Sequence, residues 1–220
     1  MNISNLMGGG TLARRRRFMT QRVERPYDAE VEYLESNRKF GYQWIQTDLF
    51  PYDGIDIYIG LMPIEYENVL STWFVSDPVG DENGGFYRLC RGTGLDALVN
   101  YKSMNSSNIY VNNVSLGIKH ELTIKHDGSI IHNGIIVNTF KYLQKAPNEP
   151  NSPFLLLGDL SLQKQTWGKL YYFKVVDNEK ILIDLIPVRI ADEGFMYDRV
   201  SGKLFGNVGT GKFILGPDIS

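Results

Sequence analysis

Apolar and polar residues alternate along most of the chain in short runs, and turn-forming residues separate the runs. The run A-E-V-E-Y-L-E-S puts Ala29, Val31 and Tyr33 on one face of a strand and Glu30 and Glu32 on the other. A period of two is typical of a strand with one buried face. No segment has a strong helical period, so the pattern predicts an all-β fold. Further strands are predicted at 42–47, 53–61, 68–75, 86–90, 97–101, 108–111, 154–158, 167–176 and 180–189.

A three-strand meander is predicted between residues 119 and 140, where the hairpin dipeptides D-G and N-G separate three apolar runs. All three histidines of the chain, His120, His126 and His132, lie here. His120 and His126 share a strand face but are about 20 Å apart at the rise of a strand, too far to bind one metal ion. Pairing across the D-G turn is the arrangement that would bring His126 next to His132. Two imidazoles without a further ligand make a weak metal site.

Composition supports one large β-rich domain. The chain has 220 residues, of which 43% are hydrophobic and 12% aromatic, with 22 glycines and 13 tyrosines. That is enough apolar material for a full core with many tight turns. The single cysteine excludes an internal disulfide. We expect neither a signal peptide nor a membrane span, because the chain contains no apolar run of the required length.

Charge divides the chain near residue 26. The net charge is −2, yet six arginines against one glutamate give the first 25 residues a charge of +5, so the remainder carries −7. The first eleven residues are glycine-rich and have too few apolar positions to fold alone. We therefore predict a basic, largely extended attachment arm at 1–26 and a folded domain at 27–220. Two parts of opposite charge are expected to meet different partners.

Within the arm, four adjacent arginines stand between apolar residues. Such a cluster repels itself and calls for an anionic counterpart, which can be phosphate, nucleic acid or an acidic protein groove. A solvated tail is the alternative. The flanking apolar residues favour docking to a protein over binding to nucleic acid. The predicted partner-attachment residues are Leu12, Arg14, Arg15, Arg16, Arg17, Phe18 and Met19.

A phosphate-loop motif, G-x-x-x-x-G-K, is matched by Gly206, Gly211 and Lys212. We interpret the match as false. Such a loop needs a following helix and a Ser or Thr after the lysine, whereas Phe213 follows here and Pro217 stands where the helix would run. The stretch instead predicts two hairpins, one from 195–197 into 204–205 and one from Val208 into 212–215, and no nucleotide site.

An acidic, glycine-rich turn between residues 76 and 85 offers oxygen ligands of the kind that calcium uses. Its candidates are Asp77, Asp81 and Asn83. The spacing of an EF-hand is missing, so an ordinary acidic turn is the favoured interpretation. We expect no cofactor, and calcium remains a weak candidate.

Both ends of the folded part resemble a known group of proteins. The opening D-A-E-V-E-Y-L-E-S-N with Y-Q-W-I-Q-T-D, and the closing P-V-R-I-A-D-E-G-F-M-Y-D-R-V-S-G-K-L-F-G-N-V-G-T-G-K-F-I-L-G-P-D-I, are similar to concanavalin A-like, LamG-type jelly-roll structural proteins of tailed phages or prophages of gut Bacteroidales. The resemblance implies a two-sheet antiparallel jelly-roll sandwich with an N-terminal arm.

The same resemblance implies a non-enzymatic virion protein, attached to capsid or tail as a decoration or fibre-type component. Its partners would be other virion proteins bound through the arm. It would be made in the cytoplasm of the host bacterium and reside in the virion.

Two other functions fit the same fold. A carbohydrate-binding module would use exposed aromatic residues to adhere to host or mucus glycans. A glycan hydrolase of this fold would carry E-x-D-x-E or E-x-D-x-x-E on one strand face. The nearest stretches, Glu30-V-Glu32-Y-L-Glu35 and Asp53-G-I-Asp56, lack that order. No Ser/His/Asp or Cys/His arrangement is identifiable, so we expect no enzymatic activity.

Overall fold

The computed structural model describes residues 25–52, 54–65, 72–76, 87–91, 97–101, 109–139, 152–158 and 166–219. In these segments the chain forms strands β1 to β17 and one 3-10 turn, η1 (Arg38–Phe40). All strand pairings are antiparallel, and they divide the strands between a larger and a smaller sheet. The prediction of an all-β, two-sheet antiparallel fold is therefore confirmed.

The larger sheet is built around two long central strands, β4 and β13, which pair along most of their length. In spatial order its main path is β11 (Ile135–Thr139), β10 (Ser129–His132), β9 (His120–Ile124), β4 (Ile55–Pro63), β13 (Gly168–Asp177), β14 (Lys180–Ile190), β15 (Glu193–Asp198) and β16 (Leu204–Phe205). Three short strands complete it: β1 (Ala29–Glu30) pairs with β14, and β2 (Leu34–Ser36) pairs with β13 and with β17 (Ile214–Leu215).

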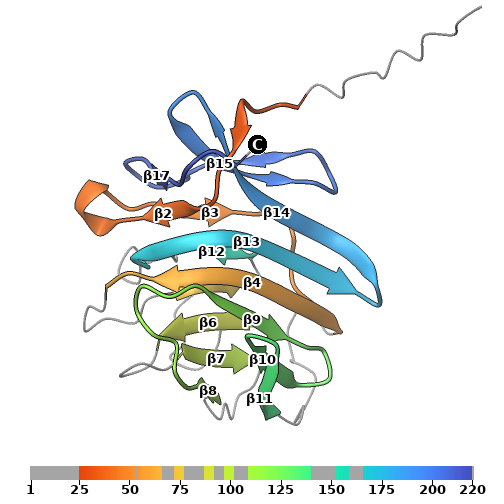
Figure 1. The fold of residues 1–220 in the computed structure, drawn as a ribbon. Coiled ribbons are helices and arrows are strands. Elements are labelled where there is room, and N and C mark those ends of the chain that lie inside the picture. Colours follow the sequence, from red (N-terminus) through yellow and green to blue (C-terminus); the bar gives the residue numbers. More distant parts are fainter. Residues whose placement is uncertain are drawn as a thin grey trace, which may run out of the picture.

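The smaller sheet lies behind the larger one in Figure 1. Its order is β3 (Ile45–Gln46), β12 (Leu155–Leu156), β5 (Thr72–Ser76), β6 (Tyr87–Arg91), β7 (Ala97–Tyr101) and β8 (Ile109–Val111). The core fills the space between the two sheets. Phe154, which precedes β12, meets Phe173 of β13 edge to face with ring centroids 5.3 Å apart. Such a contact is the favoured geometry for an aromatic pair.

Strand β4 shows how sequence alternation sets the two faces of the larger sheet. Ile55, Ile57, Ile59 and Leu61 are at most 1% exposed and point into the core. Because successive side chains of a strand point to opposite faces, the residues between them lie on the outer face of the sheet. The outer face is the one turned toward the viewer in Figure 1.

The predicted meander is confirmed as β9, β10 and β11, which pair in order. Its second turn has φ of 49° at Asn133 and 82° at Gly134. Positive φ at both central residues is what a two-residue hairpin loop of this twist requires, and Asn-Gly adopts it at low cost.

The single strand predicted over 29–36 is wrong in its second half. The chain forms β1 and β2 instead, which pair with different neighbours. Ala29 and Val31 are buried as expected, but Leu34 takes the next core position and Tyr33 lies on the outer face. The alternation slips by one residue because the chain moves from pairing with β14 to pairing with β13.

The first closing hairpin is confirmed, since β15 pairs with β16. The second is wrong. Residues 214–215 form β17, which pairs with β2 rather than folding back on Val208. The amide of Val208 donates to the carbonyl of Trp44 at 2.9 Å instead. The pairing of β17 with β2 attaches the closing segment to the larger sheet by backbone hydrogen bonds.

Candidate binding face

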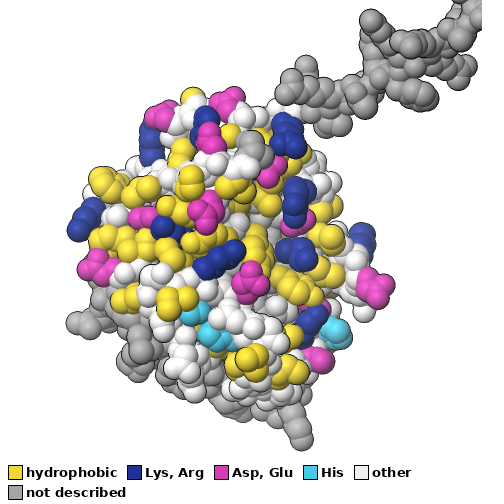
Figure 2. Space-filling view, viewed as in Figure 1, with side chains coloured by type: hydrophobic (Ala, Val, Ile, Leu, Met, Phe, Trp, Pro, Cys, Tyr) yellow, Lys and Arg dark blue, Asp and Glu magenta, His cyan; other side chains and the backbone are white. Residues whose placement is uncertain are grey.

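The outer face of the larger sheet carries tyrosines and lysines on neighbouring strands. We name it the tyrosine–lysine face, and Figure 2 shows basic side chains there among hydrophobic-coloured and acidic ones. The residues come from β4, β13, the ends of β9 and the residue before β2. The members of the face are Tyr33, Tyr58, Tyr171, Tyr172, Lys119, Lys125, Lys169 and Lys174.

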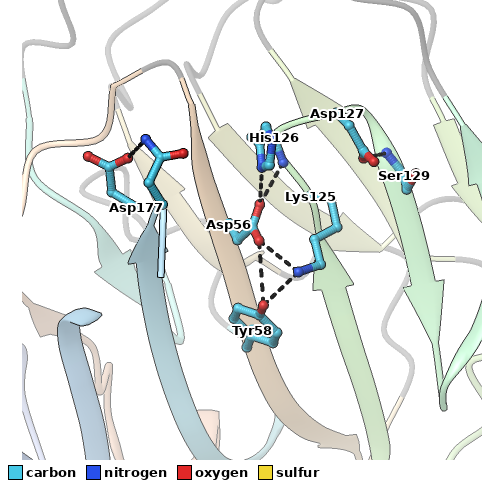
Figure 3. Close-up of polar contacts among 8 residues, drawn as sticks. Asp56, Tyr58, Lys125, His126, Asp127, Ser129 and Asp177 are labelled. Carbon is cyan, nitrogen blue, oxygen red and sulfur yellow. Dashed lines mark hydrogen bonds and ion pairs between the residues drawn. The ribbon is translucent and has the colours of Figure 1, made fainter. Parts of the chain in front are cut away.

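One end of the face is a polar cluster around Asp56 (Figure 3). Lys125 Nζ donates to Asp56 Oδ2 at 2.7 Å and to the Tyr58 hydroxyl at 2.7 Å. The backbone amide of His126 donates to Asp56 Oδ1 at 2.8 Å, and its Nδ1 lies at the same distance from that oxygen. Both carboxylate oxygens therefore have hydrogen-bond partners, as a carboxylate that is only 12% exposed requires.

Electrostatics keep this cluster charged. Burial by itself would raise the pKa of the Asp56 carboxyl, but hydrogen bonds from Lys125 and His126 outweigh burial and hold that pKa below its usual range. Burial likewise would lower the pKa of Lys125, yet its bonds to Asp56 and Tyr58 raise it above the ordinary value. The pair is thus a carboxylate and an ammonium at neutral pH.

Tyr58 is flanked by two cations. Lys125 Nζ lies 5.0 Å and Lys174 Nζ 4.7 Å from the centroid of its ring. Lys174 is the direct cross-strand partner of Tyr58 on one side and of Asp184 on the other. Asp184, in turn, binds Arg199 through Oδ2 at 2.7 Å. Lys174 therefore stands between a tyrosine on one neighbouring strand and an aspartate on the other.

The opposite end of the face is richer in aromatic contacts. Lys169 Nζ lies 3.8 Å from the centroid of Tyr33, and Tyr33 meets Tyr171 edge to face at 5.7 Å. Lys119 Nζ lies 4.7 Å from the Tyr171 ring. The Tyr171 hydroxyl donates to the sulfur of Met62 at 3.7 Å. These cation–π contacts orient the ammonium groups toward ring faces.

A glycine makes room for the central tyrosine. A Cβ at Gly60 would lie 2.6 Å from Cε1 of Tyr172, so the absence of a side chain lets this ring lie flat against β4. Burial, reinforced by the charge of Glu121, raises the pKa of Tyr172 to about 12. The Tyr172 hydroxyl therefore stays protonated at physiological pH and can donate a hydrogen bond.

The four lysines differ in their partners. Among the described residues, Lys125 pairs with Asp56 and Lys119 reaches Glu121 at 3.9 Å. Lys169 and Lys174 have no carboxylate within ion-pair distance in that part of the chain and contact tyrosine rings instead. Their ammonium protons are the donors on this face best placed to meet a ligand.

The three histidines do not meet as the sequence suggested. Pairing across the D-G turn sets His132 opposite Leu122, which brings His132 diagonally next to His120 rather than to His126. His120 Nδ1 and His132 Nε2 are 2.9 Å apart, and His120 Nε2 lies 3.0 Å from the carbonyl of Ser115. His126 sits in the turn and binds Asp56. Among the described residues no group of three or more metal-ligating side chains occurs.

The residues of the phosphate-loop match form a packed turn followed by β17, with no helix after the lysine in the described chain. Lys212 Nζ binds Asp192 Oδ2 at 2.7 Å. A Cβ at Gly211 would lie 1.8 Å from the carbonyl oxygen of Phe40. The side-chain amide of Asn207 donates through Nδ2 to the backbone carbonyl of Gly211 at 2.9 Å. The glycines thus allow close packing against the segment before β3.

The remaining candidates are divided between described and undescribed segments. The attachment residues Leu12, Arg14, Arg15, Arg16, Arg17, Phe18 and Met19, the acidic-turn residues Asp77, Asp81 and Asn83, and Asp53 all lie outside the described residues. Glu30 accepts hydrogen bonds from Arg25 and Tyr27. Glu35, on β2, lies opposite Lys169 of β13. No helix in the described segments is long and apolar enough to cross a membrane.

Sequence reasoning missed the tyrosine–lysine face itself. The sequence signal for its outward-facing residues was present in β4, where Asp56 and Tyr58 alternate with buried isoleucines. It was also present in β13, where lysines and tyrosines stand between buried apolar residues. Which strands become neighbours is decided by pairing over long sequence distances, and no local pattern encodes that. The contacts of Tyr58 with Lys125 and Lys174 therefore appear only in the folded chain.

Comparison with known proteins rests on structure alone, because no family model and no curated protein matches the sequence. A "putative carbohydrate binding protein" from Bacteroides ovatus ATCC 8483 has a TM-score of 0.56 and 11% identity, and the match covers 88% of this chain. This chain spans only 62% of that protein. A heptameric SAP-like pentraxin from Limulus polyphemus has a TM-score of 0.53 and 10% identity, with 87% of this chain and 96% of the pentraxin covered.

Identities this low show the fold and nothing finer. Both similar structures are two-sheet jelly rolls of the concanavalin A-like type, and the topology of this chain, two antiparallel sheets around one core, agrees with them. The chain therefore has a concanavalin A-like jelly-roll fold.

Proposed function

We propose that this domain is a non-enzymatic glycan-binding module and that the tyrosine–lysine face is its binding surface. The observation that carries the proposal is the interleaving of four tyrosines with four lysines on one solvent-facing sheet surface. The name of the Bacteroides ovatus protein, "putative carbohydrate binding protein", supports the proposal, although an identity of 11% carries no function over to this chain.

The chemistry of the face suits a sugar. A pyranose ring has an apolar face of C–H groups that packs on an aromatic ring, and its rim of hydroxyls needs charged or polar partners. Tyr172 offers a ring held in place over Gly60 and a protonated hydroxyl. Lys174 and Lys169 offer ammonium donors that no described carboxylate engages. Because neighbouring contacts already hold these side chains, binding would cost less conformational entropy.

A glycan array, followed by calorimetric titration of the best hit with the full chain, tests the proposal. We expect Tyr172→Ala and Lys174→Ala each to weaken binding about tenfold or more, which corresponds to about 1.4 kcal/mol. The matched controls are Tyr42→Ala and Lys203→Ala, two residues exposed outside the face; they should bind as the parent does. Absence of any glycan binding at millimolar concentration, or equal loss in the controls, would contradict the proposal.

The same experiment separates binding from hydrolysis. The parent chain is incubated with each bound glycan, and soluble products are measured. We expect none, because the carboxylates of Glu30, Glu35 and Asp56 lie on three different strands, and those of Glu30 and Asp56 are already bound by Arg25 and Lys125. Release of product would replace the binding module by a glycan hydrolase.

As a second candidate we propose that the chain is a virion component tied to a neighbouring capsid or tail protein by residues 1–26. The contrast between an arm of charge +5 and a remainder of −7 supports this proposal, as does the resemblance of both chain ends to phage jelly-roll proteins. Deleting residues 2–20 should abolish incorporation into particles while the circular dichroism of the domain is unchanged. Incorporation of the deletion variant at the level of the parent chain would contradict this proposal. The two proposals are compatible, since one concerns the arm and the other the sheet.

A further inference from the structure

We propose that β11 is the strand through which two copies of this chain pair, edge to edge and antiparallel, to form one continuous sheet. The inference concerns a different surface from the tyrosine–lysine face and does not depend on glycan binding. It starts from the position of β11, which ends the main path of the larger sheet among the described strands; β10 is hydrogen-bonded to it, and β8 of the smaller sheet lies close by without pairing to it.

The side chains of β11 are unusually apolar for a sheet edge. All five residues of the strand are exposed. Ile135 is 69% exposed, Ile136 63% and Val137 42%. A strand edge offers unpaired amides and carbonyls, and proteins normally protect it with lysine, proline, a charge on the inward face or a covering segment. None of the five residues of β11 is charged or a proline.

Charge favours a second copy over other occupants. Residues 128–140 contain no lysine, arginine, aspartate or glutamate, so two copies of this segment meet without like-charge repulsion. The arm at 1–26 carries four adjacent arginines and would find no carboxylate on this segment. Self-pairing of this uncharged strand forms the isologous contact typical of twofold dimers.

The geometry has a functional consequence. A twofold axis that relates two antiparallel strands of one sheet stands perpendicular to that sheet, so both copies present the same face to the same side. The tyrosine–lysine faces of the two copies would therefore point in one direction. Two weak sites on one rigid platform bind a repetitive polymer far more tightly than one site does.

The test measures the mass of the full chain by sedimentation equilibrium. We expect the parent to be a dimer at about 100 µM, a range typical of modest interfaces. The double variant Ile135→Lys with Val137→Lys should be monomeric, because lysine on a sheet edge blocks pairing. The control Val200→Lys places a single lysine on an exposed valine of a turn outside β11 and should remain dimeric.

Hydrogen exchange adds a second measurement that does not depend on substitution. Amides of β11 should be better protected at about 100 µM than at about 1 µM, whereas those of β15 should not change. A parent that is monomeric at the higher concentration overturns the proposal. So does a lysine double variant that stays dimeric, or β11 protection that is the same at both concentrations.

Discussion

Lys125 Nζ lies 2.7 Å from Asp56 Oδ2 on the outer face of the larger sheet. Asp56 is the second residue of β4, and Lys125 directly follows the neighbouring strand β9, just before the turn at 126–128. The carboxylate also accepts the amide of His126 at 2.8 Å. Asp56 thus joins the β9–β10 turn to the central strand, and it holds the ammonium of Lys125 beside Tyr58.

Asp56→Asn should lower the free energy of unfolding at pH 7 by about 2 kcal/mol, because hydrogen bonds to a charged group contribute about 1.5–3 kcal/mol and Lys125 would lose its anion. Urea unfolding measures the loss. Asp192→Asn is the matched control, since it breaks the ion pair of Lys212 at an exposed site, where such pairs contribute little. An equal loss in both variants would contradict the role assigned to Asp56.

The same variant should change stability in acid. The folded-state pKa of Asp56 is below the usual range, so its stabilisation is present above the unfolded pKa of about 3.9 and is lost as pH falls through the folded value. Between about pH 5 and pH 2 the parent should therefore lose more stability than Asp56→Asn. Parallel curves for the two proteins would count against this account.

His132 should make the protein less stable as pH falls below neutrality. Burial, followed by the nearby charge of His120, lowers the pKa of His132 in the folded state. Between that pKa and the unfolded value of about 6.5, the unfolded chain binds a proton that the folded chain does not, so the free energy of unfolding falls with falling pH. Urea midpoints measured through this range should show the decline, and His132→Gln should reduce it. A titration of His132 by NMR with a midpoint above about 6.5 would refute the assignment.

Gly211→Ala should destabilise the closing turn. Gly211 has φ of +78°, and a Cβ there would lie 1.8 Å from the carbonyl oxygen of Phe40, so both backbone strain and a clash oppose the change. The expected loss is about 3 kcal/mol, against about 1 kcal/mol for strain alone. Gly117→Ala supplies the strain-only control, since Gly117 has φ of +70° and nothing within 4 Å of the added carbon. Similar losses at the two sites would show that the turn moves aside at little cost.

Asp198→Ala should be among the more costly substitutions in the closing hairpin. The side chain is buried and accepts the amide of Asp184 at 2.9 Å, those of Val200 and Ser201 at 3.1 Å, and the hydroxyl of Ser201. Alanine leaves several partly buried donors without partners, and we expect a loss of about 3 kcal/mol. Thermal unfolding would measure it. Ser201→Ala removes one of these donors and should cost distinctly less; the reverse order would exclude Asp198 as the organiser of the turn.

Much of the fold was predictable where its cause is local. Alternation of isoleucines identified β4, because a strand with one buried face needs that period. The D-G and N-G dipeptides placed the β9–β11 meander, because few residues adopt positive φ cheaply. Local patterns failed at Tyr33, where the chain changes partner strand between β1 and β2, and at Val208, whose amide binds Trp44 rather than β17.

By itself, therefore, the sequence determined that the chain is all-β, where most strands run and how the central meander turns. Only the tertiary structure decided that Lys174 stands beside Tyr58, that His132 meets His120 rather than His126, and that β17 closes on β2. These contacts join segments far apart in the chain. Their register follows from the burial of the whole core and the summed strand pairing, which no short stretch of residues specifies.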